Sequence, residues 1–296
     1  MLPHHGRYAY SPIVGRAPFT WPNGARLAVY LGVNLEHFAF GEGLGAELAP
    51  GGPQPDVLNY AWRDYGNRVG AWRLLETLDR LALPASVIVN SAMVDYAPSL
   101  IEAHLRRGDE IVGHGRTNSE RQSVFSETDE RALIAEATAA LARACGGVAP
   151  RGWLSPWIAE SRTTPDLLVE AGFRYTLNWC MDDSPVWMHT RAGPLLAVPY
   201  PQELNDIPSI VARKDGADAF ADMIVDNFNE MLEQAAEGPG LVMGIALHPY
   251  IVGQPYRLRR LRAALAHVAH DRERIWFATA GQIAAASSRL PEGTLA

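Results

Sequence analysis

Short apolar runs alternate along this chain with longer segments whose apolar residues recur at helical spacing. The runs that resemble buried strands are 27–34, 85–89, 110–112, 152–154, 174–178, 195–199, 241–247 and 275–278. The segments with helical spacing are 68–82, 98–107, 127–144, 164–171, 217–236, 257–269 and 280–288. This alternation predicts parallel strands that are joined by crossover helices.

About seven such strand–helix units in one chain favour a barrel over an open sheet. We therefore expect the α/β class, with one barrel domain over residues 27–290 and an N-terminal extension over residues 1–26 that packs on the barrel or on a partner subunit. Segments 38–60 and 202–216 are rich in Gly, Pro and polar residues. We expect them to be long loops that shape a substrate pocket.

Polar residues gather where apolar runs stop, in the clusters 34–37, 114–121, 151–156 and 248–250. Because side chains alternate along a strand, Asn34 and Glu36 would share a face if the first strand continues to Glu36. Each cluster also has an ordinary interpretation, such as a surface carboxylate at Glu36 or a loop histidine at His114. His248 follows the apolar run LVMGIAL, and a buried histidine needs a polar partner, so a functional role is favoured there.

Two polar pairs lie in turn-like sequence. Asp182 and Asp183 precede Ser-Pro, and Asn205 and Asp206 lie in the second predicted loop. Each pair is compatible with an ordinary turn or with a contact to substrate, and a carboxylate of the first pair could instead orient the imidazole of His248.

Two aromatic residues, Trp153 and Tyr250, belong to the polar clusters. We expect both to contact substrate, although a core position is the default for a tryptophan.

The composition restricts the class of function. The formal net charge is -7 and the sequence pI is about 5.7, which argues against a nucleic-acid or anionic-membrane binder. The N-terminus lacks the apolar core of a signal peptide, and no apolar run is long enough to span a bilayer. The two cysteines, Cys145 and Cys180, do not suggest a disulfide framework. These features favour a cytoplasmic protein with a small, soluble substrate.

Seven motifs follow one another along the chain: VNLEHF (33–38), RDYGNRVG (63–70), GHGRTNS (113–119), PRGWLSP (150–156), TPDLLVEAGFRYTLNWCMDDSP (164–185), NDIP (205–208) and LHPYIVGQPYR (247–257). Their order resembles the polysaccharide deacetylase superfamily, and most closely its branch of cofactor-independent allantoinases and related cyclic-amide hydrolases. The resemblance implies a distorted (β/α)7-type barrel and a homo-oligomer, either a dimer or a tetramer. The aromatic residues Tyr8, Tyr10, Phe19 and Trp21 could form a subunit contact or could pack over their own barrel.

In metal-dependent members of that superfamily, the matching positions hold a catalytic base, three metal ligands and a general acid. By position, Asn34 matches the base, which an amide cannot replace, and Glu36 matches the acidic ligand. His114 matches the first metal histidine, Asn118 stands where the second would be, and His248 matches the general acid. The resemblance therefore implies either no cofactor or one divalent ion (Zn, Mn or Co) held weakly by Glu36, His114 and Asn118.

These residues predict a hydrolase of non-peptide C–N bonds in a small ureide, imide or lactam. In the metal-free case, Glu36 accepts a proton from water, with a pKa raised by burial, and His248 protonates the leaving nitrogen. His114 and Asn118 hold the water or polarise the carbonyl, and Arg151 stabilises a carboxylate or the oxyanion. The alternatives are a metal-dependent N-deacetylase of sugars and a non-catalytic ligand-binding protein.

Overall fold

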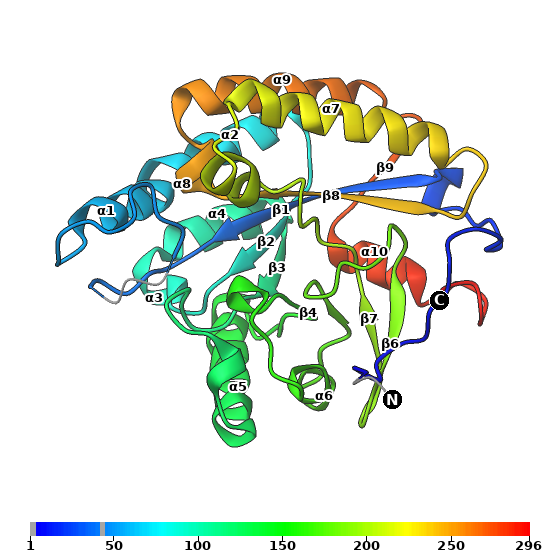
Figure 1. Cartoon of the computed structure of the whole chain (residues 1–296), viewed down its shortest axis with the longest axis horizontal. Coiled ribbons are helices and arrows are strands. Elements are labelled where there is room, and N and C mark those ends of the chain that lie inside the picture. Colours follow the sequence, from blue (N-terminus) through cyan, green and yellow to red (C-terminus); the bar gives the residue numbers. More distant parts are fainter. Residues whose placement is uncertain (1–3, 42–44) are drawn as a thin grey trace.

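The computed structural model describes residues 4–41 and 45–296 of the chain. They form a mixed α/β domain around a curled, mostly parallel sheet with the order β6-β7-β5-β4-β3-β2-β1-β8 (Figure 1). Only β6 and β7 pair in antiparallel fashion within this path, and the short β9 also pairs with β1. The strands are β1 (Leu27–Leu35), β2 (Ser86–Val89), β3 (Glu110–Gly113), β4 (Gly152–Trp153), β5 (Tyr175–Thr176), β6 (Val186–Thr190), β7 (Gly193–Ala197), β8 (Leu241–Leu247) and β9 (Trp276–Phe277).

Helices cover the outside of this half-barrel, and α7 and α9 lie side by side across one face of it (Figure 1). The helices are α1 (Val57–Tyr65), α2 (Ala71–Leu81), α3 (Met93–Tyr96), α4 (Pro98–Arg107), α5 (Glu127–Ala144), α6 (Thr164–Glu170), α7 (Ala217–Gln234), α8 (Pro249–Val252), α9 (Pro255–His270) and α10 (Ala280–Ser287). The segments Gly66–Gly70 and Ile207–Ala212 are π-helical. The predicted fold class and barrel architecture are confirmed.

Alternating side chains of the central strands sort into two layers. One set packs under the outer helices, as Leu27, Val29, Leu31, Val33 and Leu35 of β1 do. The other set faces the inside of the barrel, where Ala28 and Tyr30 pack with residues of the neighbouring strands. Asn34 and Glu36 continue this inner row, as the period of two predicted.

The predicted loops contain more regular structure than the sequence indicated. The segment 38–60 ends inside α1, and the segment 202–216 contains the π-helical turn Ile207–Ala212. Strand β6 was not expected, because its residues follow turn-like sequence and lie at the edge of the sheet. In the described part of the chain, no helix has the length and apolar character needed to cross a bilayer.

Candidate active site

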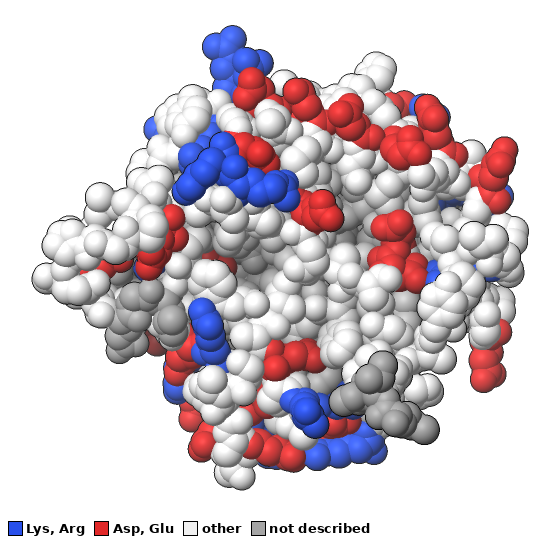
Figure 2. Space-filling model, viewed as in Figure 1, with Lys and Arg blue, Asp and Glu red and all other residues white. Residues whose placement is uncertain are grey.

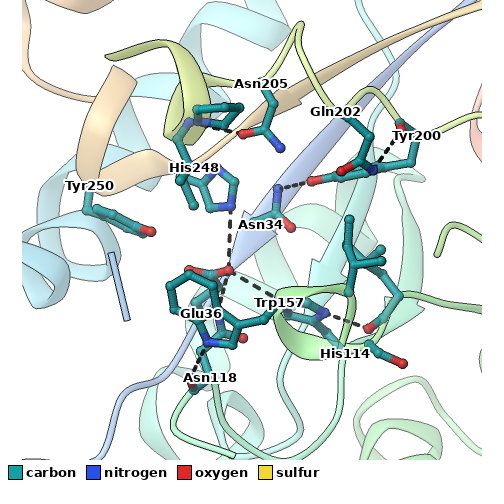
Figure 3. Close-up of a pocket in the computed structure, with 15 residues that line it drawn as sticks. Asn34, Glu36, His114, Asn118, Trp157, Tyr200, Gln202, Asn205, His248 and Tyr250 are labelled. Atoms are coloured by element: carbon teal, nitrogen blue, oxygen red, sulfur yellow. Dashed lines mark hydrogen bonds and ion pairs between the residues drawn. The ribbon is translucent and has the colours of Figure 1, made fainter. Parts of the chain in front are cut away.

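A small cavity lies at the carboxyl ends of the central strands, with a volume of about 210 Å³. Its polar lining includes Asn34, Glu36, His114, Asn118 and His248 (Figure 3). Neither Lys nor Arg occurs among the described residues that line it. In the space-filling view, the hollowed centre of the face is bordered mainly by uncharged residues, and charged side chains lie around its periphery (Figure 2). The described lining therefore offers no Lys or Arg side chain to pair with an anionic ligand.

Glu36 is the anionic centre of this cavity and is 4% exposed. Its Oε1 accepts a hydrogen bond from Asn118 Nδ2 at 2.7 Å and lies 3.5 Å from the Nε2 atoms of His114 and His248. Burial raises the pKa of Glu36, but the positive charge of His248, whose Nε2 lies 3.5 Å away, outweighs burial and lowers this pKa to about 2. This corrects the expectation of a raised pKa: Glu36 is ionised at neutral pH.

His248 is held by Asp206, which is fully buried behind it. The Nδ1 of His248 lies 2.6 Å from Asp206 Oδ1, and its backbone N–H donates to Oδ2 at 2.7 Å. Burial lowers the pKa of His248, but the charges of Asp206 and Glu36 raise it to about 10. His248 is therefore an imidazolium whose Nε2–H faces the cavity. Asp206 orients it from behind and does not line the cavity, which corrects its predicted role as a substrate contact.

His114 presents a lone pair to the cavity. Its Nδ1 lies 2.6 Å from the carbonyl oxygen of Leu154 and must donate a hydrogen to it. In the neutral ring this assigns the lone pair to Nε2, which is buried and has no hydrogen-bond partner among the described residues. His114 is therefore placed to accept a hydrogen bond from a water molecule.

The carboxamide of Asn118 is oriented by a second asparagine, Asn90. The backbone N–H of His37 donates to Asn90 Oδ1 at 2.8 Å, so Asn90 Nδ2 is left to donate to Asn118 Oδ1 at 3.3 Å. Asn118 Nδ2 then points to Glu36. Since this orientation follows from the hydrogen-bond network, Asn118 offers amide hydrogens, not its oxygen, to the centre of the site.

This donor set does not fit the divalent metal that the resemblance allowed. A metal ion needs lone-pair donors, and Asn118 turns its Nδ2 hydrogens to the site while His248 is protonated. Only Glu36 and His114 remain as ligands. Across residues 4–41 and 45–296, no group of three or more His, Cys, Asp or Glu side chains is placed to hold a metal ion.

Two residues of the cluster 151–156 lie away from the cavity, contrary to the prediction. Arg151 is exposed, precedes β4 at the end opposite the cavity, and donates to the carbonyl oxygen of Gly172 at 3.4 Å. Trp153 is fully buried, with its ring centroid 5.2 Å from that of Phe173. Neither residue can contact a ligand in this cavity.

The acidic pair 182–183 also lies elsewhere. Asp182 forms a bidentate ion pair with Arg16, whose Nη1 and Nη2 donate to its two carboxylate oxygens at 2.8 and 2.6 Å. Asp183 lines a separate cavity. The carboxylate that orients His248 is therefore Asp206 and not a member of this pair.

Three other predicted residues, Asn34, Asn205 and Tyr250, do line the cavity. Asn34 Nδ2 donates to the hydroxyl of Tyr200 at 3.0 Å, and Asn205 Oδ1 accepts from the backbone N–H of Ile207 at 3.0 Å. The amide of Asn34 thus occupies a fixed place in the wall of the cavity.

The sequence reasoning missed Asn90 and the lining residues Trp157, Tyr200 and Gln202. Asn90 directly follows the apolar run 85–89, which is the same signal that identified His114. The three lining residues come from loops after β4 and β7 and carry no comparable signal.

Residues 58–176 match the model of the polysaccharide deacetylase family. A provisionally named polysaccharide deacetylase of Schizosaccharomyces pombe is 28% identical over 298 residues, which cover 90% of this chain and 92% of that protein. A crystal structure described as a probable polysaccharide deacetylase of Pseudomonas aeruginosa is 26% identical, with a TM-score of 0.83 over 97% of this chain and 100% of that chain. The structure of the PuuE allantoinase is also 26% identical, with a TM-score of 0.80 over 94% and 97%.

Proposed function

We propose that this protein hydrolyses an amide-type C–N bond in a small, uncharged substrate such as a cyclic ureide, imide or lactam, since residues 58–176 match the polysaccharide deacetylase family and the whole fold is similar to such a structure. One observation carries this proposal. Oε1 of the ionised Glu36 lies 3.5 Å from Nε2 of the His248 imidazolium. Among the described residues, no Lys or Arg side chain lines the cavity that contains this pair. A base and an acid are thus already in the protonation states that amide hydrolysis requires.

In this reaction, the oxygen of a water molecule attacks the substrate carbonyl carbon. Glu36 accepts a proton from that water, and the π electrons of the carbonyl move to its oxygen, which gives a tetrahedral oxyanion. The electron pair then returns to re-form the carbonyl, the C–N bond breaks, and His248 donates its Nε2 proton to the departing nitrogen. His114 Nε2 accepts a hydrogen bond from the water and helps to orient it.

The two proton transfers support each other. A carboxyl group with a pKa of about 2 is a weak base while the imidazolium stands beside it. When His248 gives its proton to nitrogen, the neighbouring positive charge that lowers the pKa of Glu36 disappears. Burial then dominates and favours the protonated carboxyl group.

The cavity favours a small substrate over a polymer. Its volume of about 210 Å³ is below the roughly 300–1,000 Å³ that is typical of ligand pockets. The carboxamides of Asn34, Gln202 and Asn205 line it and are complementary to the N–H and C=O edges of an amide. The likeness to an allantoinase over most of both chains supports the same class of substrate.

The test is hydrolysis of hydantoin, dihydrouracil, succinimide, allantoin and chitotriose by protein that has been dialysed against EDTA. We expect turnover of at least one cyclic amide without added metal. Glu36→Gln should lower kcat by about 10²–10⁴-fold, because the amide cannot accept the proton. The matched control is Glu76→Gln, since Glu76 is an exposed carboxylate that pairs with Arg80 on α2.

Deacetylation of chitotriose alone, or turnover that appears only after Zn²⁺ is added, would contradict the proposal. Equal activity of Glu36→Gln and the parent would remove Glu36 from the mechanism.

A further inference from the structure

The hydroxyl of Tyr250 is a buried polar group without a partner. Tyr250 is 3% exposed and lines the cavity, and its oxygen has no hydrogen-bond partner among the described residues. Figure 3 shows this hydroxyl turned toward Glu36 and the centre of the site. A buried hydroxyl that makes no hydrogen bond destabilises the fold, so its retention here calls for an explanation.

The ring of Tyr250 is held by its neighbours on several sides. Its centroid lies 4.9 Å from that of Trp62, 6.0 Å from that of Phe38 and 5.7 Å from that of His248, in edge-to-face arrangements. The backbone of Tyr250 packs directly on Gly66, where a Cβ atom would come within 2.6 Å of the Tyr250 nitrogen. The hydroxyl therefore stays directed into the cavity.

The hydroxyl remains a hydrogen-bond donor at neutral pH. Burial raises its pKa well above the usual value, and the negative charges of Glu36 and Asp206 raise it further. Three N–H donors near the hydroxyl are already engaged: Asn34 Nδ2 with Tyr200, Asn118 Nδ2 with Glu36, and Trp157 Nε1 with the Asn118 carbonyl oxygen.

We propose that Tyr250 is a further catalytic residue, whose O–H donates a hydrogen bond to the oxygen of the attacked carbonyl and stabilises the oxyanion. This inference rests on the proposed function and deepens it, because it assigns the group that stabilises the charge formed between water attack and C–N cleavage. No proton is transferred from Tyr250. The hydrogen bond strengthens as negative charge develops on the oxygen and weakens again when the carbonyl re-forms.

The first test is Tyr250→Phe, which keeps the ring and removes only the hydroxyl. On the best cyclic amide of the panel, kcat should fall about 10²–10³-fold, as is typical for loss of one oxyanion donor, while KM changes little. The melting temperature should stay the same or rise, because the lost hydroxyl had no partner. The control is Tyr256→Phe on α9, whose ring is 61% exposed.

The second test is independent of turnover and uses calorimetric titration. A cyclic phosphonamidate, which mimics the tetrahedral oxyanion, should bind Tyr250→Phe at least about 10-fold more weakly than the parent protein. Planar hydantoin should bind both proteins equally. This difference isolates the contact that is made only in the tetrahedral state.

Three results overturn the inference: an unchanged kcat, a change in KM alone, or an acid limb of the pH profile that moves with the substitution. The last result would mean that Tyr250 acts through the pKa of Glu36. If the parent protein neither hydrolyses the cyclic amides nor binds the phosphonamidate, the proposed function fails, and the inference fails with it.

Discussion

Two carboxylates, Glu36 and Glu160, illustrate how the neighbours of a group decide its charge. Glu36 lies beside two imidazoles, and its pKa is lowered to about 2. Glu160 accepts hydrogen bonds from Asn178 Nδ2 at 2.7 Å and Trp179 Nε1 at 2.6 Å, but burial is the larger influence and raises its pKa to about 7. Neutral donors therefore compensate less for burial than a neighbouring cation does.

Glu160 predicts a pH-dependent contribution to stability. In the unfolded chain a glutamate has a pKa near 4.5, so between about pH 4.5 and 7 the folded protein retains a proton that the unfolded chain has lost. The contribution of Glu160 therefore falls as pH rises through this window. Relative to Glu160→Gln, the unfolding free energy of the parent should decrease by about 1–3 kcal/mol from pH 5 to pH 8.

Urea unfolding of both proteins at the two pH values measures this difference, and Glu102→Gln, which changes an exposed carboxylate on α4, serves as the control. A difference that is constant, or that grows with pH, would show that the two N–H donors keep Glu160 ionised throughout.

At the residue scale, the sequence predicted the central groups of the site better than their partners. Glu36, His114 and His248 each follow a buried strand, so their convergence could be inferred from the topology alone. That Asp206 and not Asp182 is the partner of His248 could not be inferred from the sequence, because it depends on how a loop folds back on the barrel. The sign of the pKa shift of Glu36 was missed for the same reason, since it depends on two imidazoles at 3.5 Å.

At the scale of elements, the short helix α8 packs against glycines of the π-helical segment Gly66–Gly70. A Cβ atom at Gly70 would lie 2.1 Å from the carbonyl oxygen of Pro249, and Gly253 approaches Gly70 with similar closeness. This contact explains the glycines of the motif RDYGNRVG, which the sequence singled out without a role. Since His248 and Tyr250 flank Pro249, the packing of two elements sets the positions of both side chains.

Gly70→Ala should therefore disturb stability and turnover together. The added methyl group cannot be accommodated without moving α8, which we expect to cost about 1–3 kcal/mol of unfolding free energy. It should also lower kcat, because His248 and Tyr250 would move with the helix. Thermal unfolding and kinetics measure the two effects, with Gly52→Ala in an open loop as control. Full stability in Gly70→Ala would mean that α8 adjusts freely.

The sequence predicted most elements but not those at the margins of the fold. The helices 98–107 and 127–144 and the strand 241–247 have the predicted bounds, because strong periodicity or a long apolar run marks each of them. Strand β4 has only two residues, so no period could separate its inward and outward positions. This is why Trp153 was expected in the cavity and lies instead in the core.

At the scale of the whole molecule, the N-terminal segment around Arg7 and the C-terminal Ala296 both lie beside the edge strand β6 (Figure 1). The backbone N–H of His189 donates to the carbonyl oxygen of Arg7 at 2.7 Å. The backbone N–H of Trp187 donates to the carbonyl oxygen of Ala296 at 2.8 Å. Of the N-terminal aromatic residues, Phe19 and Trp21 are buried on their own barrel, while Tyr10 is 89% exposed. Whether Tyr10 contacts a second subunit stays a prediction.

Removing residues 1–16 should uncover this edge and leave the active site intact. The deletion removes two bidentate ion pairs, Arg7 with Asp166 and Arg16 with Asp182. It also removes the carbonyl oxygen of Arg7 that accepts from the His189 N–H. We expect the unfolding free energy to fall by about 1–3 kcal/mol and the exposed strand edge to promote association. The kcat of the freshly purified deletion variant should be retained, because residues 4–26 contribute nothing to the cavity lining.

Urea unfolding and light scattering test these expectations, and the double variant Asp166→Asn, Asp182→Asn separates the ion pairs from the edge. This variant keeps the segment over β6, so it should lose stability without associating. If it associates as strongly as the deletion, charge and not the covered edge keeps the molecules apart. If the deletion is as stable as the full chain and has the same oligomeric state, the N-terminal segment has no structural role at β6.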